Sequence, residues 1–184
     1  IYTLSLHDAL PILPISQKVE GISYIDCLFT ATSAVCVTGL VTLPTVSART
    51  AFGKVIIIIL IQMGGLGFMT FTTLVSLILR KKISFGERVI IKEQTNSFQL
   101  SGMVKLIKYI LLCTFVIEFV GAVFLMIRFV PKFGLKGIPI SLFHSISAFC
   151  NAGFDILNTN SLIPFNQDKL ILIVLGTLVF LGGL

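Results

Sequence analysis

The sequence predicts an all-α membrane protein in which two parallel repeats each place a short re-entrant helix and a loop between membrane spans. Three observations support this fold class: long apolar runs without charge, a basic cluster confined to one connecting segment, and a twelve-residue stretch that recurs later in the chain. Hydrophobic residues make up 55% of the sequence and charged residues only 12%, against about 25% in soluble domains. This balance excludes an ordinary soluble domain.

Long apolar runs define the expected spans. The run at 55–79 carries no charge over 25 residues, and about 20 apolar residues suffice to cross a bilayer. We therefore expect one helix over 52–79 and a second over 103–129, ending just before Pro131. We expect a third span to begin at Leu170 and to be cut short by the end of the chain.

The basic residues are concentrated in one connecting segment. Seven of the fourteen Lys and Arg residues lie between Arg80 and Lys108. Because a basic cluster beside apolar spans marks a cytoplasmic loop, the net charge of +6 indicates membrane topology and not a nucleic-acid partner. Within this loop, residues 84–100 alternate between apolar and charged side chains, which suits an interfacial helix that docks on a partner or on anionic lipid. The sequence thus predicts a multi-pass protein of the cell membrane with its basic loop in the cytoplasm.

A short segment occurs twice in the chain. Residues 29–40 read FTATSAVCVTGL and residues 143–154 read FHSISAFCNAGF, so five of twelve positions are identical at an offset of 114. The identical pairs are Phe29 and Phe143, Ser33 and Ser147, Ala34 and Ala148, Cys36 and Cys150, and Gly39 and Gly153. The Gly-Gly-Leu of 64–66 recurs at 182–184, at an offset of 118. Similarity at a fixed offset indicates a fold built from repeated units.

Each copy predicts a short helix, at 23–34 and 141–149, followed by a loop. These helices are too short to cross a bilayer, and non-helical backbone at membrane depth is tolerated only where protein encloses it or it lines a watery cavity. Each copy is therefore expected to be a pore helix with a filter-like loop. Two spans separate the copies, so both enter from the face opposite the basic loop, and the repeats are parallel.

The loops after the short helices carry the candidate binding groups. A helix that enters halfway directs the partial negative charge of its C-terminus toward the membrane centre, which favours a cation there. Gly39 and Gly153 permit a positive φ, so that successive carbonyls can turn to one side and replace the water shell of an ion. The predicted ion ligands are the backbone carbonyls of Val37, Thr38, Gly39, Leu40, Asn151, Ala152, Gly153 and Phe154.

Several other residues keep alternative interpretations. Glu118 lies midway along a span, where an acid is costly and suggests a function. Its alternatives are a pair with Arg128 or a place in a polar seam between helices. His144 lies in the second short helix and either faces water or packs on a neighbour. Close packing is the expected role of five small residues, which are Gly64, Gly65, Gly67, Cys36 and Cys150.

These features divide the chain into four segments. Residues 1–12 match neither a signal peptide nor a span and are expected to be non-native sequence. Residues 13–82 hold the loop and second span of repeat one, and residues 83–102 form the cytoplasmic amphipathic linker. Residues 103–184 hold repeat two with a truncated second span. The chain is therefore expected to be a fragment of a larger pore.

Three motifs in order along the chain carry a family resemblance. They are TSAVCVTGL at 32–40, IQMGGLGFMT at 61–70 and SAFCNAGF at 147–154. Together they resemble the Trk/Ktr/HKT superfamily of potassium transporters and, within it, the KtrB type of membrane subunit, over about residues 13–184. The resemblance implies a potassium-channel-like pore in which one chain supplies four units of span, pore loop and span, so this chain would hold parts of two.

The resemblance also implies a function and partners. It implies potassium translocation across the cell membrane through a filter of backbone carbonyls, with K⁺ as the transported ion and Na⁺ as a stimulating or co-transported ion. It further implies a homodimer docked on a cytoplasmic nucleotide-binding regulatory subunit of the KtrA type. A channel for another monovalent cation and a non-conducting membrane scaffold remain as alternatives. An enzyme has no support, because the sequence shows no phosphate-binding Gly loop, metal cluster or nucleophile–base set.

Overall fold

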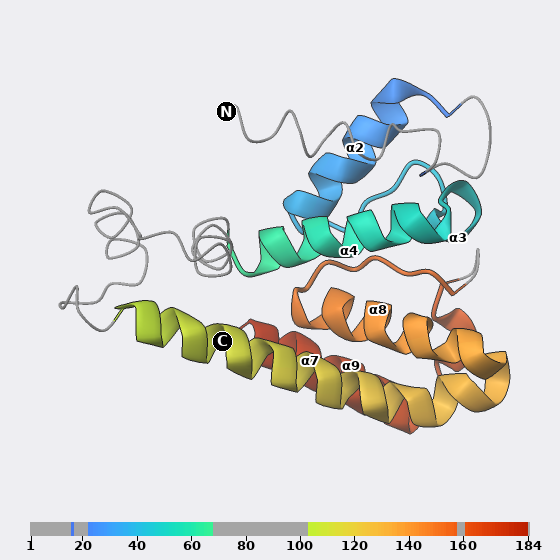
Figure 1. Ribbon diagram of the computed structural model, residues 1–184. Helices are drawn as coiled ribbons and strands as arrows, with labels where there is room; N and C mark the ends of the chain where they lie inside the picture. Colours follow the sequence, from blue (N-terminus) through green and yellow to red (C-terminus); the bar gives the residue numbers. More distant parts are fainter. Residues whose placement is uncertain (1–15, 17–21, 68–102, 158–160, 184) are drawn as a thin grey trace. The chain divides into compact units, whose positions relative to one another are not determined.

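The computed structural model describes residue 16 and residues 22–67, 103–157 and 161–183, and this part of the chain is mostly helical (Figure 1). Internal contacts divide the chain into two units, one of Ile1–Gly65 with Glu118–Leu184 and one of Leu66–Ile117. The segment expected to be non-native, 1–12, and the amphipathic segment, 84–100, lie outside the described residues, and both expectations stay predictions.

The first helix, α2 (Tyr24–Val35), agrees with the short helix predicted at 23–34. It begins where the Ser23 hydroxyl accepts a hydrogen bond from the backbone N–H of Ile25 at 3.3 Å, which satisfies one of the free amides of the first turn. A single helical turn, α3 (Thr45–Ala48), then leads into α4 (Ala51–Gly65).

The helix α4 is shorter than the first span expected from sequence. The sequence predicts one continuous helix over 52–79, but α4 ends at Gly65, and the next residues, Leu66 and Gly67, are not helical. Gly67 has φ +77°, a left-handed conformation that glycine adopts readily and that commonly ends a helix. The glycines that predict close packing therefore also interrupt the helix, and residues 68–79 lie outside the described part.

The helix α7 (Met103–Phe133) runs four residues beyond the predicted end at 129 and includes Pro131. Proline removes one backbone hydrogen bond, but here only two helical residues follow it, so the loss falls in the last turn. A 3₁₀ turn, η3 (Gly134–Lys136), joins α7 to α8 (Gly137–Phe149), which starts four residues before the predicted 141. Residues 107–149 together form a helical stretch that is long and apolar enough to cross a membrane.

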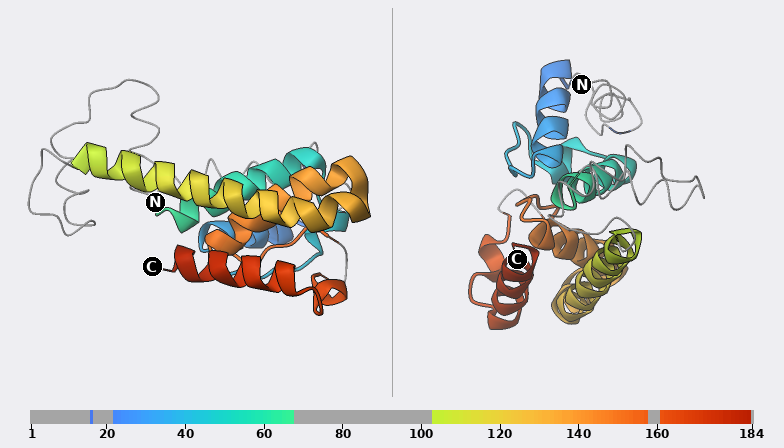
Figure 2. Two further views of the ribbon diagram at one scale, coloured as in Figure 1. Left: turned by 90° about the horizontal axis from the view of Figure 1, so that it is seen from below. Right: turned by 90° about the vertical axis from the view of Figure 1, so that its left-hand side faces the viewer.

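In the first unit, α4 packs against both α2 and α8, and α8 also packs against α9 (Lys169–Gly182) (Figures 1 and 2). One core cluster joins α2, α4, α8 and the loop after α8. Its most buried members include Ala31, Ile57, Leu60, Ile61, Phe143 and Ala152. A second cluster joins α7 and α9 through the turn η4 (Ile163–Phe165), with Leu125, Phe129, Phe165 and Ile171. Apolar packing thus holds the loop after α8 in place.

Large apolar side chains remain exposed on α7 and α9. In the first unit they include Phe119, Val120, Phe124, Ile127, Ile173 and Phe180. In the second unit, the start of α7 exposes Tyr109, Leu112, Phe115 and Val116. Soluble monomers rarely expose apolar patches of this kind, whereas lipid covers them at no cost. Together with the apolar stretch 107–149, this surface agrees with the predicted all-α membrane protein.

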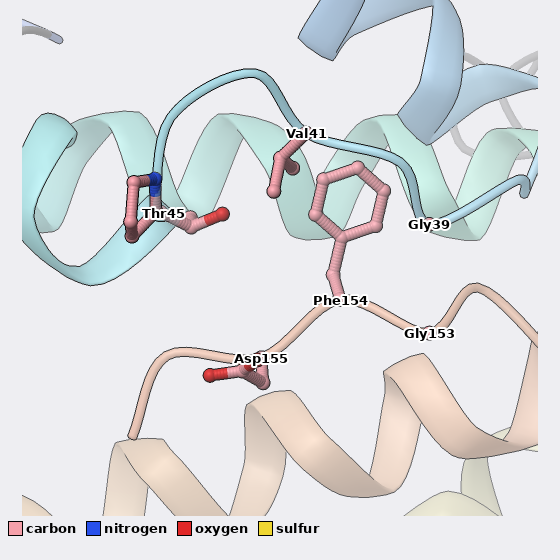
Figure 3. Close-up of a pocket in the computed structure, with 7 residues that line it drawn as sticks. Gly39, Val41, Thr45, Gly153, Phe154 and Asp155 are labelled. Carbon is pink, nitrogen blue, oxygen red and sulfur yellow. The ribbon is translucent and has the colours of Figure 1, made fainter. Parts of the chain in front are cut away.

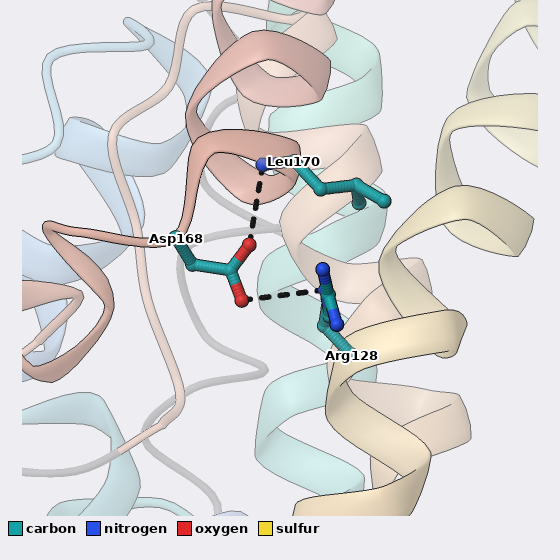
Figure 4. A network of polar contacts seen from close by, with 3 residues as sticks. All are labelled: Arg128, Asp168 and Leu170. Carbon is teal, nitrogen blue, oxygen red and sulfur yellow. Dashed lines mark hydrogen bonds and ion pairs between the residues drawn. The ribbon is translucent and has the colours of Figure 1, made fainter.

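The start of α9 is fixed by Asp168 (Figure 4). One carboxylate oxygen accepts a hydrogen bond from the backbone N–H of Leu170 at 3.2 Å, and the other lies 3.4 Å from Nε of Arg128. The interpretation that Arg128 pairs with Glu118 is therefore wrong. The reason is geometric: ten residues along a helix separate the two by about 15 Å, while α9 brings Asp168 next to Arg128.

Candidate ion-binding loops

Two loops, loop 1 (Val37–Leu40) and loop 2 (Asn151–Phe154), contain the eight predicted ligands. Each follows a short helix whose last residue is succeeded by a cysteine, Cys36 after α2 and Cys150 after α8. The first two backbone N–H groups of each loop donate hydrogen bonds to backbone carbonyls in the last turns of the preceding helix. The bonds are Val37 to Ala34 at 3.3 Å, Thr38 to Ser33 at 3.0 Å, Asn151 to Ala148 at 3.0 Å and Ala152 to Ser147 at 2.8 Å. This pattern is the Schellman motif, and it is the same in both loops.

Positive φ angles alternate along both loops. They occur at Val37 (58°) and Gly39 (74°) in loop 1 and at Asn151 (57°) and Gly153 (70°) in loop 2. Asparagine and glycine adopt this region readily, but a β-branched residue there is an outlier. The strain at Val37 is of order 1–3 kcal/mol and persists only because the surrounding structure enforces it.

The carbonyls of the two loops are mostly unpaired. Among the hydrogen bonds of the described residues, the only one that ends on any of the eight predicted carbonyls is donated by the Ser147 hydroxyl to Phe154, at 2.7 Å. The other seven carbonyls therefore have no protein donor in this part of the chain. Backbone carbonyls need a partner when water is scarce, so these groups are available to an ion or to water.

The two loops approach each other at their glycines (Figure 3). A Cβ built on Gly39 would overlap the carbonyl oxygen of Ala152 and lie 3.2 Å from Cα of Gly153. A Cβ on Gly153 would lie 3.7 Å from Cα of Gly39. A pocket of about 150 Å³ lies beside this contact, and the Phe154 side chain reaches across it toward loop 1. The structure thus brings the two predicted glycines together at one place.

Two further glycines allow helices to close on the loops. A Cβ on Gly64 would overlap the carbonyl oxygen of Val35, and one on Gly182 would overlap that of Phe149. These pairs correspond, since Gly182 follows Gly64 by 118 residues and Phe149 follows Val35 by 114. A Cβ on Gly65 would lie within 2.6 Å of Cβ of Cys150. The predicted packing role of Gly64 and Gly65 is confirmed.

Comparison with known proteins decides the family. The profile of the TrkH family, described as a cation transport protein, matches residues 4–184. The chain belongs to the TrkH family. The predicted superfamily membership is thereby confirmed, and the family is one of cation transport proteins.

This TrkH-family chain is similar to several named uptake proteins. It is 47% identical to the potassium/sodium uptake protein NtpJ of Enterococcus hirae over 92% of the chain and 38% of that relative. It is 43% identical to the Ktr system potassium uptake protein B of Bacillus subtilis over 99% of the chain and 41% of that relative. The protein of the same name in Vibrio alginolyticus is 39% identical over 91% of this chain and 37% of that relative. The chain spans about two fifths of the length of these curated relatives.

The TrkH-family chain also carries polar groups that sequence reasoning did not place. Glu118 accepts a hydrogen bond from Nε2 of Gln62 at 2.9 Å, so it lies in a polar seam between α7 and α4. Gln62 was missed, although an amide inside the apolar run at 55–79 is a visible signal. Asp155, which lines the pocket beside the two glycines, was also missed, and its signal is an acid directly after the second repeated segment.

His144 packs on its neighbours and does not face water. Its side chain is buried, and its Nδ1 lies 2.7 Å from the carbonyl oxygen of Ile140. Its ring packs against the rings of Phe129 and Phe143, with centroids 5.7 and 5.9 Å apart. Among the described residues, no group of three or more His, Cys, Asp or Glu side chains lies close enough to hold a metal ion.

Proposed function

We propose that this chain contributes two ion-coordinating loops to a membrane pore that translocates potassium. The carbonyls of loop 1 and loop 2 replace part of the water shell of the ion. One observation carries the proposal. In both loops, the first two backbone N–H groups donate to carbonyls of the preceding helix, while seven of the eight loop carbonyls have no protein donor within the described part. Each loop therefore has two of its four N–H groups engaged, while most of its carbonyl oxygens stay free, which suits a cation.

The electrostatics of the loops favour the same ligand. Both loops follow the C-terminal ends of helices α2 and α8, where the helix dipole places partial negative charge. Neither loop contains an acidic residue, so carbonyl dipoles and not a ring of carboxylates would coordinate the ion. Asp155 follows loop 2 directly and adds negative charge beside the glycine contact.

The names of the relatives guide the choice of ion. Two of them are named for potassium uptake and one for potassium and sodium uptake. Potassium is therefore the transported ion in this proposal, and sodium is a stimulating or co-transported ion. The full protein is proposed as a multi-pass membrane subunit with four such loops, a homodimer, and a partner of a KtrA-type regulatory subunit.

The test replaces the loop glycines in the full-length protein. We expect Gly39→Ser and Gly153→Ser each to lower the ratio of potassium to sodium uptake roughly tenfold, because a left-handed residue with a side chain costs about 1–2 kcal/mol and misplaces the carbonyls. Gly176→Ser is the matched control, since a Cβ there meets no atom within 4 Å. Uptake is measured in cells that lack their own potassium transporters, at equal amounts of membrane protein. An unchanged ratio in both loop variants would remove the filter assignment.

The same cells separate the two alternative functions. Growth on low potassium that depends on the wild-type gene supports potassium translocation. Uptake of sodium, rubidium or lithium without potassium indicates a channel for another monovalent cation. Absence of any cation flux from protein that reaches the membrane indicates a non-conducting scaffold.

A further inference from the structure

Glu118 in α7, Gln62 in α4 and Cys150 at the end of α8 form a buried polar chain within the first unit, which we call the brace. Their exposed fractions are 2%, 9% and 7%. Nε2 of Gln62 donates to Oε1 of Glu118 at 2.9 Å, and Sγ of Cys150 donates to Oε1 of Gln62 at 3.7 Å. The brace therefore connects a membrane span to the residue that immediately precedes loop 2.

The chemistry of the brace fixes its orientation. An ionised carboxylate only accepts hydrogen bonds, and a thiol is a weak donor. With an ionised Glu118, the amide of Gln62 serves both partners when its NH₂ group faces Glu118 and its oxygen faces Cys150, and the structure has this arrangement. Each group in the chain has a definite role, so loss of the amide leaves the carboxylate without this donor.

Two further contacts tighten the brace around Cys150. The hydroxyl of Ser145, fully buried in α8, donates to the backbone carbonyl of Glu118 at 2.6 Å. Gly65, three residues after Gln62, brings α4 so close that a Cβ there would overlap the side chain of Cys150. The helix α4 thus contacts the residue before loop 2 directly, and α7 is bonded to α8 five residues earlier, at Ser145.

Loop 1 has no counterpart of the brace in the described part of the chain. Its matching cysteine, Cys36, is exposed. Among the described residues, the cysteine that the Gln62 amide contacts is the one before loop 2.

We infer that Glu118 and Gln62 are positioning residues that set the conformation of loop 2, and with it the discrimination between potassium and sodium, by holding Cys150. This inference rests on the proposed function, because it assigns a role within the same pore. Neither side chain is required to touch the ion; both act through the backbone that follows Cys150.

The experiment removes and then exchanges the partners of the brace in the full-length protein. We expect Glu118→Ala and Gln62→Leu each to lower the potassium to sodium uptake ratio roughly tenfold, since each leaves a buried polar partner unsatisfied. The double variant Gln62→Glu with Glu118→Gln exchanges the two side chains and keeps an amide donor for a carboxylate. We expect it to return the ratio to within about threefold of wild type. Phe119→Ala, at the exposed neighbour of Glu118, is the control and leaves the ratio unchanged.

The outcomes distinguish this inference from the proposed function. If the loop glycine variants alter selectivity while Glu118→Ala and Gln62→Leu do not, the brace is not a positioning device and the pore proposal stands. If the exchanged double variant reaches the membrane but shows no recovery, the inference is also overturned. If the glycine variants have no effect either, the proposed function itself fails. Should Glu118→Ala not accumulate, Gln62→Leu decides, because it is neutral and close in size.

Discussion

Gly39 and Gly153 occupy matching positions, but their surroundings differ. Both have a positive φ, so any side chain costs backbone strain at either site. At Gly39 a Cβ would also overlap the backbone of loop 2, whereas at Gly153 the nearest atom to a Cβ lies at an ordinary 3.7 Å. Backbone atoms have no rotamer to change, so the first clash can be relieved only by moving a loop.

The two alanine variants should therefore differ in stability. We expect Gly153→Ala to lower the free energy of unfolding by about 1–2 kcal/mol, from the left-handed conformation alone. Gly39→Ala should cost measurably more. Gly176→Ala is the control, because this helical position is open and alanine is favoured over glycine there by roughly 0.5–1 kcal/mol. Thermal unfolding in detergent gives the order, and equal costs at 39 and 153 would contradict the loop contact.

Helix ends decide where the loops lie in space. The helix α9 depends on Asp168, which both accepts from the first turn of α9 and pairs with Arg128 of α7 (Figure 4). Arg128 is half exposed, so this ion pair contributes at most about 1 kcal/mol. The cap is the stronger contribution, because it satisfies a backbone amide that has no partner within the helix.

Removal of the cap should destabilise the protein more than removal of the ion pair. We expect Asp168→Ala to lower the free energy of unfolding by about 0.5–2 kcal/mol, the usual cost of losing an N-cap. Asp168→Asn keeps an oxygen that accepts the same bond and should lose less, and Arg128→Met should lose least. The three variants are compared by thermal unfolding at two salt concentrations. A salt-sensitive loss that is largest for Arg128→Met would show that the ion pair dominates.

Helix positions follow from sequence more reliably than helix ends. Apolar runs and the repeated segments predict the bounds of α2 and α9 to within about two residues. The end of α4 was missed because the apolar run continues past Gly67, and hydrophobicity does not reveal which glycine turns left-handed. The end of α7 was missed because Pro131 was expected to end the helix, as a proline in a helix interior often does. In the structure Pro131 lies in the last turn, which tolerates it.

At the scale of the whole molecule, the candidate site also has features that the sequence predicts and features that it does not. The repeated segments could be found from sequence, because the loop conformation is set locally by the helix end and the glycines that follow. The contact between Gly39 and Gly153, and the bond from Gln62 to Glu118, could not be found in this way. They join residues 114 and 56 positions apart, which only the tertiary fold, including the packing of α4 against α8, brings together.

The basic loop is the part of the molecule through which a cytoplasmic partner would act. Residues 84–100 combine apolar and charged side chains in a segment that we expect, from the charge distribution, on the cytoplasmic side. Such a segment can dock on a protein surface, and it can also lie on anionic lipid. The KtrA-type regulatory subunit of the proposed function is the protein partner to test.

Replacement of residues 84–100 by a Gly/Ser linker of equal length tests this role without shortening the connection between the spans. We expect binding of a purified KtrA-type regulatory subunit to the full-length protein in detergent to weaken by at least about tenfold, the equivalent of 1.4 kcal/mol. Detergent without anionic lipid removes the competing membrane interaction, so a loss there concerns the protein partner alone. Vesicles with and without anionic lipid then measure the lipid interaction separately. If the regulator binds the linker variant as tightly as the wild type, residues 84–100 are not its docking surface.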